Sequence, residues 1–232
     1  MQFYQKVWFL PSKEKQVQGI LLQSKPYLDR GAILQVFTPE GLFPLFHKRR
    51  KKEPTYMSHP FCVSELLLKK NLSNLDSIID HQVLDWNFPL RSSLANLQSA
   101  GKMAKNIIAS QIGVKPAPLL YALFKSYLQK IPLFTHPEIL AQSFALKLQI
   151  HEGTLHISPR CAFCTEPSSH VENGQSVCRK HAKRKDLPTT NWNTVLLLAL
   201  AKRFQELKAL DEDKRVATTV QALQGFFLDS EA

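Results

Sequence analysis

Four side chains of this sequence have the types and the spacing of a metal site. Two residues separate Cys161 from Cys164, thirteen residues follow, and two residues separate Cys178 from His181. Two residues between ligands allow a tight turn that directs both side chains at one ion, and three thiolates with one imidazole complete a tetrahedral zinc shell. The spacing therefore predicts one structural Zn²⁺ held by these four residues.

The segment between the two pairs is polar and carries the turn residues Pro167, Asn173 and Gly174. This composition is typical of a loop that is ordered by a metal ion rather than by an apolar core. His170 lies inside this segment and is a weaker candidate for the fourth ligand, because it lacks the paired two-residue spacing. Cys62 lies far from the cluster in sequence, and we expect it to be a small buried apolar side chain.

A catalytic zinc is the alternative to a structural one. His136 and Glu138 precede the first cysteine pair in the order of the zinc nucleobase deaminases, whose signature is H-x-E followed by P-C-x-x-C. Thr135 and Glu138, however, have the spacing of a capping box at the start of a helix. The second ligand pair would also close the shell that a hydrolytic zinc leaves open. Because no phosphate-binding glycine loop or hydrolase motif is present either, we expect no enzymatic activity.

The secondary structure that must position these residues is predicted to change from strands to helices along the chain. Up to about residue 60, the segments 19–22 and 32–38 are short and apolar, and Pro39-Glu40-Gly41 supplies turn chemistry, which predicts a small barrel or sandwich. Further along, apolar residues recur at spacings of three and four, which predicts amphipathic helices. These residues are Leu120, Phe124, Tyr127 and Ile131; Leu140, Phe144 and Leu148; Leu196, Leu200, Phe204 and Leu207; and Val216, Val220, Leu223 and Phe227. A weaker helix is predicted over residues 93–110, where Gly101 interrupts the pattern.

The charge of the chain indicates a polyanionic partner. Lys and Arg number 30 against 19 Asp and Glu, a net charge of +11, and ten of the cations lie in two short runs, 48–52 and 179–185. Such an excess favours nucleic acid. The longest apolar run, 195–201, is too short to span a membrane, and the first residues do not read as a secretory signal. We expect a cytoplasmic protein with reduced cysteines.

In the order of these features the chain resembles the bacterial recombination mediators of the RecO family. The resemblance rests on GILLQSKPYLDRGAILQVFTPEGLF followed by HKRRKK, on YALFKSYL, on FALKLQIHEGTLHISPRCAFC and on the zinc cluster, and covers most of residues 17–181. Two positions depart from the family pattern. Relatives commonly have cysteine where His181 stands, and His47-Lys48 replaces a glycine that often precedes the basic pair.

The resemblance implies an α+β architecture, with an N-terminal OB-fold barrel over 1–80 and a helical domain over 81–156. A zinc-binding knuckle over 157–185 is inserted before C-terminal helices, 186–232, that complete the helical domain. The implied activity is binding of single- and double-stranded DNA and annealing of complementary strands. The implied partners are RecR and single-stranded-DNA-binding protein (SSB), and indirectly RecA, with a location in the cytoplasm at the nucleoid.

An OB-fold holds strands in a basic groove with aromatic rings on which bases stack. We therefore expect phosphate contacts from Lys48, Arg49, Arg50, Lys51 and Lys52. Phe43, Phe46 and Tyr56 are candidates for stacking on bases, but for Phe43 and Phe46 we favour a place in the barrel core. A zinc-stabilised RNA-binding protein would carry the same basic runs, so this alternative stays open at the level of sequence.

Overall fold

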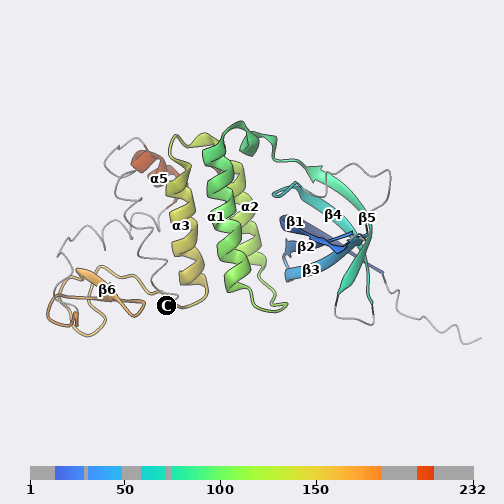
Figure 1. Ribbon diagram of the computed structural model, residues 1–232. Coiled ribbons are helices and arrows are strands. Elements are labelled where there is room, and N and C mark those ends of the chain that lie inside the picture. Colours follow the sequence, from blue (N-terminus) through green and yellow to red (C-terminus); the bar gives the residue numbers. More distant parts are fainter. Residues whose placement is uncertain (1–13, 29–30, 49–58, 72–74, 184–202, 212–232) are drawn as a thin grey trace, which may run out of the picture. The chain divides into compact units, whose positions relative to one another are not determined.

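The computed structural model describes residues 14–28, 31–48, 59–71, 75–183 and 203–211. The chain divides into two compact units, 1–86 with 113–116 and 87–112 with 117–232. The first unit contains a β-barrel, and the second contains helices and the cysteine-rich segment (Figure 1). Among the described residues, no helix is long and apolar enough to cross a membrane.

The prediction of a small N-terminal barrel is confirmed. The barrel is closed in the strand order β1-β2-β3-β5-β4, as in an OB-fold. Both segments that were predicted as strands lie inside β1 and β2, and the predicted turn joins β2 to β3. In that turn the backbone N–H of Glu40 donates to Thr38 Oγ1 over 3.1 Å. The strands are β1 (Glu14–Tyr27), β2 (Gly31–Thr38), β3 (Gly41–Lys48), β4 (Val63–Lys69) and β5 (Asp76–Asp85).

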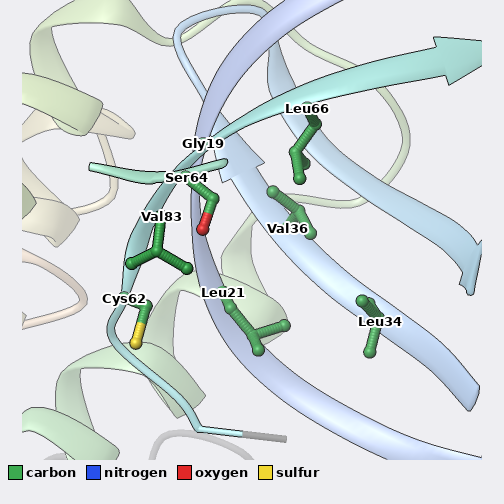
Figure 2. A pocket seen from close by; sticks show the side chains of 8 residues that line it. All are labelled: Gly19, Leu21, Leu34, Val36, Cys62, Ser64, Leu66 and Val83. Atoms are coloured by element: carbon green, nitrogen blue, oxygen red, sulfur yellow. The ribbon is translucent and has the colours of Figure 1, made fainter. Parts of the chain in front are cut away.

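Alternate side chains of the strands fill the inside of the barrel, as the period of two along a strand requires. Gly19 has no room for a side chain, because an added Cβ would lie 2.4 Å from Val36 Cγ1. A cavity of about 10 Å³ remains, and Cys62, buried as expected, is one of the residues that line it (Figure 2). Such a cavity holds at most about one water molecule, so it is no site for a nucleotide. The core residues are Val17, Leu21, Leu34, Val36, Leu45, Leu66, Leu68 and Ile78.

The helices of the second unit follow the predicted periodicity. The helix predicted over 93–110 is α1, and its N-cap Ser93 accepts a hydrogen bond from the backbone N–H of Asn96 over 3.1 Å. All the predicted apolar positions between 120 and 148 are buried. Ten of the fifteen residues of α3 are buried, so α3 is the central helix of this unit. The elements are η3 (Phe88–Ser92), α1 (Leu94–Ser110), α2 (Pro118–Lys130), η4 (Ile131–Leu133), α3 (Pro137–His151) and α5 (Phe204–Asp211).

The region in which C-terminal helices were predicted is only partly described. Within α5, Leu207 is buried, and Phe204 packs its ring 4.7 Å from that of Tyr127. The predicted apolar positions at 196, 200, 216, 220, 223 and 227 lie outside the described residues. The described part of this region therefore consists of α5, which packs on α3.

The predicted capping box at the start of α3 is wrong. The helix begins at Pro137 with His136 as the N-cap and has no side-chain cap, so Thr135 and Glu138 are one residue out of register. Instead, the Asp211 carboxylate accepts hydrogen bonds from the backbone N–H groups of Thr135 and His136, over 2.9 and 2.7 Å. The free N–H groups before a helix need an acceptor, and here that acceptor comes from another helix, which sequence spacing does not reveal.

The segment between the two ligand pairs contains a short hairpin, rather than only the loop that was expected. β6 (His170–Glu172) pairs with β7 (Gln175–Val177) in antiparallel fashion. Asn173 and Gly174 both have positive φ, 49° and 74°, as the two central residues of a type I′ turn require. An added Cβ on Gly174 would also lie 2.1 Å from the carbonyl oxygen of Thr154, so this glycine allows the hairpin to lie against the chain after α3.

Candidate metal centre and nucleic-acid interface

The structure brings together the four residues of the predicted metal site. The ligand atoms of Cys161, Cys164, Cys178 and His181 all lie within 4.8 Å of one another. Hydrogen bonds hold the two turns that carry them: Cys161 N donates to Glu166 O over 2.9 Å, and His181 N donates to Cys178 O over 3.0 Å. Phe163 N also donates to Cys161 Sγ over 3.4 Å. The backbone therefore aims both pairs at one point.

The distances between these atoms fit a tetrahedral ion. Zn–S bonds of about 2.3 Å and Zn–N bonds of about 2.0–2.1 Å place two sulfurs roughly 3.8 Å apart and sulfur and nitrogen roughly 3.6 Å apart. The Sγ atoms of Cys164 and Cys178 are 3.7 Å apart. His181 Nδ1 lies 3.5 Å from Cys161 Sγ and 3.3 Å from Cys178 Sγ. The cluster could hold a metal ion, and its donor set is the one that zinc prefers.

The local electrostatics favour the thiolate form of Cys161 and Cys178, whose pKa values are lowered. They do not favour it at Cys164, where a backbone hydrogen bond at Glu166 lowers the pKa but burial and the neighbouring thiols raise it by more. Burial alone would raise the pKa of the Cys161 thiol, but backbone N–H donors, first that of Phe163, and the contact with His181 lower this pKa to about 6. Hydrogen bonds to Cys161 and Cys178 raise the pKa of His181. Because the thiolate is the ligand form of cysteine, Cys161 needs little further stabilisation to bind a cation.

The geometry gives no support to the deaminase alternative. Four protein ligands fill a tetrahedral shell and leave no position for a reacting water molecule. His136, the ligand that the deaminase order requires, is not part of the cluster, and its Nδ1 lies 3.4 Å from Glu138 Oε1. Among the described residues, no other group of three or more His, Cys, Asp and Glu side chains gathers its ligand atoms in this way. His170 also lies outside the cluster, with Nδ1 2.8 Å from Ser169 Oγ.

The first basic run is described only at its start. Lys48 is exposed and ends β3. Arg49, Arg50, Lys51 and Lys52, and with them Tyr56, lie outside the described residues. The run therefore begins at the last residue of β3, and its DNA contacts stay a prediction. In the second run, Arg179, Lys180 and Lys183 are exposed, while residues 184 and 185 lie outside the described part.

The outer face of the barrel carries an aromatic pair, of which sequence reasoning named Phe46, with the core as its favoured place, and missed Tyr27. Phe43 packs against the barrel core, as expected. Phe46 lies outside that core, and its ring meets the ring of Tyr27 at a centroid distance of 6.2 Å and an angle of 82°. The Tyr27 side chain is exposed, at 46%. The two rings form an edge-to-face pair that offers an aromatic surface to solvent.

The strand register explains how these rings meet. Tyr27 pairs with Gly31, and Gly31 pairs with Lys48, so the three positions share one face of the sheet. Phe46 lies two residues before Lys48 and thus on the same face. Gly31 has no side chain, and Phe46 Cε2 lies 3.1 Å from the point where its Cβ would be. Alternation from the core residues Val17 and Leu21 would have placed Tyr27 inside the barrel. The register of β1 against β2 shifts between Leu21 and Gln23, so only the structure shows that Tyr27 faces outward next to Phe46.

Comparison with known proteins gives consistent matches. The chain is 31% identical over 204 residues, 84% of this chain and 81% of the relative, to a protein of Chlamydia pneumoniae named DNA repair protein RecO. It is 31% identical over 223 residues, 90% of each chain, to the protein of the same name from Chlamydia trachomatis serovar D. A Chlamydia muridarum protein, also named DNA repair protein RecO, is 31% identical over 203 residues, 84% of this chain and 87% of the relative. No family model matches the chain.

Proposed function

Because the chain belongs to the RecO family of DNA repair proteins, we propose that it binds single- and double-stranded DNA and anneals complementary strands. Together with RecR it helps to load RecA onto DNA that is coated with SSB. It does so without catalysing a reaction, in the bacterial cytoplasm at the nucleoid. The barrel strands, the last of which ends at Asp85 and so beyond the expected boundary at residue 80, supply the OB-fold. The helices that follow up to residue 156 and residues 186–232 supply the helical domain, and residues 157–185 the zinc module.

One observation carries the DNA-binding part of this proposal: the face of the barrel on which Tyr27 and Phe46 meet. Lys48 lies next to Gly31 on this face, and Lys25, which pairs with Ile33, is exposed on the same side. Single-stranded nucleic acid is bound by cations that follow the phosphates and by rings on which bases stack. This face combines both kinds of group, and Lys48 on it is the first residue of the basic run 48–52.

The contacts on this face are independent of sequence, as annealing requires. Stacking accepts every base, because each has a π-face, and ammonium and guanidinium groups recognise phosphates without reading bases. The sequence of the two strands is then read by their own base pairing. A protein of this kind needs to hold a strand in an accessible form and to reduce the repulsion between two polyanions, and a net charge of +11 suits that task.

We further propose that the metal is one Zn²⁺ per chain, bound by Cys161, Cys164, Cys178 and His181. When bound, the ion supplies no reaction; it crosslinks the two turns and so stabilises a module that has few buried apolar residues. The core of this module consists of Cys161, Val177, Cys178 and Ala182, with Cys164 packed against them. Because so small a core stabilises little by itself, the fold of the module is expected to depend on the metal.

The experiment that tests the function is strand annealing on SSB-coated DNA, with and without a RecR partner. The expected result is faster annealing than SSB-coated DNA shows alone, and RecA loading that requires both proteins. A matched RNA strand in the same binding assay separates a DNA mediator from an RNA-binding protein. Stronger binding to RNA than to DNA, together with no annealing of DNA, would overturn the proposal.

A further inference from the structure

The turn between the first two metal ligands exposes an aromatic ring. Phe163 lies between Cys161 and Cys164, and its side chain is 65% exposed. Its ring centroid lies 5.7 Å from that of His181, with 54° between the planes. His181 therefore lies beside the ring in space, and Cys161 and Cys164 lie on either side of Phe163 in the sequence. Exposure of an ordered aromatic ring to water is unfavourable, and Phe163 is not one of the residues of the module core.

Three cationic residues of the same module each neighbour a metal ligand in the chain. Arg160 precedes Cys161, whereas Arg179 and Lys180 lie between the second pair of ligands. Since the ligand atoms are within 4.8 Å of one another and consecutive Cα atoms are about 3.8 Å apart, the backbones of these three residues lie close to the cluster. All three are exposed. Lys180 lies 3.6 Å from Glu166, but an exposed pair of this kind is weak and gives way readily to a phosphate.

We propose that this surface, made by Phe163 with Arg160, Arg179 and Lys180, is a second binding site for single-stranded DNA, in which one base stacks on Phe163. The proposal rests on the proposed function, since it adds a site to a protein that binds DNA on its barrel. The chemistry favours nucleic acid over a protein partner. A protein interface has a contiguous apolar centre, whereas Phe163 is the one large exposed apolar side chain among the described residues of 157–183. A single ring bordered by cations is the composition of a single-strand site.

A second site would give one chain two places to hold DNA, as an annealing protein needs. The barrel face and the zinc turn each offer an aromatic surface and cations, and both accept any base sequence. Each site can then hold a separate strand or a separate stretch of one strand. Loss of Phe163 is accordingly expected to reduce annealing more than it reduces binding of a short oligonucleotide at the barrel.

The test measures the affinity of the full-length, zinc-loaded protein for a fluorescently labelled oligo(dT) long enough to reach both sites, by anisotropy. Phe163→Ala is expected to weaken binding by about five- to a hundred-and-fortyfold, which corresponds to the cost of removing a stacked ring. Phe163→Trp is expected to restore the affinity.

The slope of log affinity against log salt stays unchanged, since stacking releases no counterions. Affinity for a duplex changes far less, because its bases are already paired. Leu119→Ala, which removes an exposed apolar side chain on α2, 77% exposed, is the matched control and is expected to bind as the parent does.

Each other outcome is decisive. If Phe163→Ala keeps its zinc and binds single strands as the parent does, the site is refuted, while DNA binding at the barrel stands. If duplex binding falls equally, the ring has only a structural role and the site is refuted. Should Phe163→Ala lose zinc, Phe163→Leu is compared with Phe163→Trp, and equal affinity of these two variants refutes stacking. If the parent protein binds no DNA at all, the proposed function fails, and this inference fails with it.

Discussion

Asp211 and His136 are joined by a 2.7 Å hydrogen bond from the backbone N–H of His136 to the carboxylate, although 75 residues separate them in the chain. The same carboxylate accepts from Thr135 and from Lys208 Nζ, over 2.9 and 2.8 Å, and its side chain is only 1% exposed. Lys208 also donates to the carbonyl oxygen of Leu133 over 2.7 Å. This buried group connects α5 to the start of α3, so α5 stabilises the central helix of the unit.

Asp211→Ala is expected to lower the free energy of unfolding by about 1–3 kcal/mol, because it leaves two backbone N–H groups without their acceptor. Thr135→Ala is the matched control. The Thr135 side chain makes no cap hydrogen bond, so its loss is expected to cost less than about 0.5 kcal/mol. Urea unfolding of the three proteins measures both values. A larger loss for Thr135→Ala than for Asp211→Ala would mean that the capping box is real after all.

The same carboxylate predicts a dependence of stability on pH. Burial alone would raise the pKa of Asp211, but Lys208 and the N–H groups of Thr135 and His136 lower it below its ordinary value. A pKa that is lower in the folded state means that the unfolded chain binds the proton more readily. The stabilisation is thus complete above the unfolded pKa, near 3.9, and is lost as the pH falls through the folded value. Unfolding measured at pH 7 and pH 3 should show the difference between parent and Asp211→Ala shrinking in acid; a constant difference would contradict this assignment.

Zinc content tests the metal site. Protein purified without chelator is expected to contain one zinc per chain by elemental analysis. Cys161→Ser should lose the ion and unfold residues 157–183 at least locally, because zinc binding to such sites in small peptides contributes roughly 10–16 kcal/mol of apparent free energy. Cys62→Ala is the control. Cys62 is buried in the barrel, so its substitution is expected to leave the zinc content unchanged. Absence of zinc from the parent protein would rule out the site.

Local spacing was enough to predict that Cys161, Cys164, Cys178 and His181 come together. It was not enough to predict the groups that act across long distances in sequence. Two-residue spacings place ligands on one turn, and three- and four-residue spacings place apolar side chains on one helix face, so both could be read from the chain. Asp211 acts on residues more than seventy positions earlier, and Tyr27 meets Phe46 only through the register of three strands. Such contacts depend on the tertiary fold, which residue patterns do not encode locally.

The basic run is expected to make ionic contacts that salt weakens. If three of its five cations contact phosphates, the slope of log affinity against log salt on single strands contains about −2 from this run, since about 0.7 counterions are released per phosphate. Between about 50 and 200 mM salt this corresponds to nearly twentyfold weaker binding. Substituting Arg49, Arg50 and Lys51 together by alanine should flatten the slope by that amount for all DNA sequences and leave the zinc content unchanged.

The control for this variant removes cations elsewhere. Lys102 and Lys105 are exposed on α1, and replacing both by alanine is expected to change the slope by much less than the triple variant does. An unaltered slope for the triple variant would show that the run is only a solvated surface segment, and the ionic contacts would then have to come from the run 179–185.

For the aromatic pair on the barrel we predict a loss of affinity without a change in salt slope, in contrast to the basic run. Tyr27→Ala is expected to weaken single-strand binding by about 1–3 kcal/mol, the cost of removing a stacked ring, without changing the salt slope. Tyr27→Phe keeps the ring and is expected to bind as the parent does, because stacking does not need the hydroxyl. Tyr27 is exposed, so the alanine variant should unfold at nearly the parent's urea concentration. A changed affinity then reports on binding rather than on folding.

Fluorescence anisotropy with a short oligo(dT) at two salt concentrations separates the effect of the ring from that of the basic run. Equal affinity of Tyr27→Ala and the parent would show that this face of the barrel carries no stacked base, and would leave Phe163 as the ring to examine.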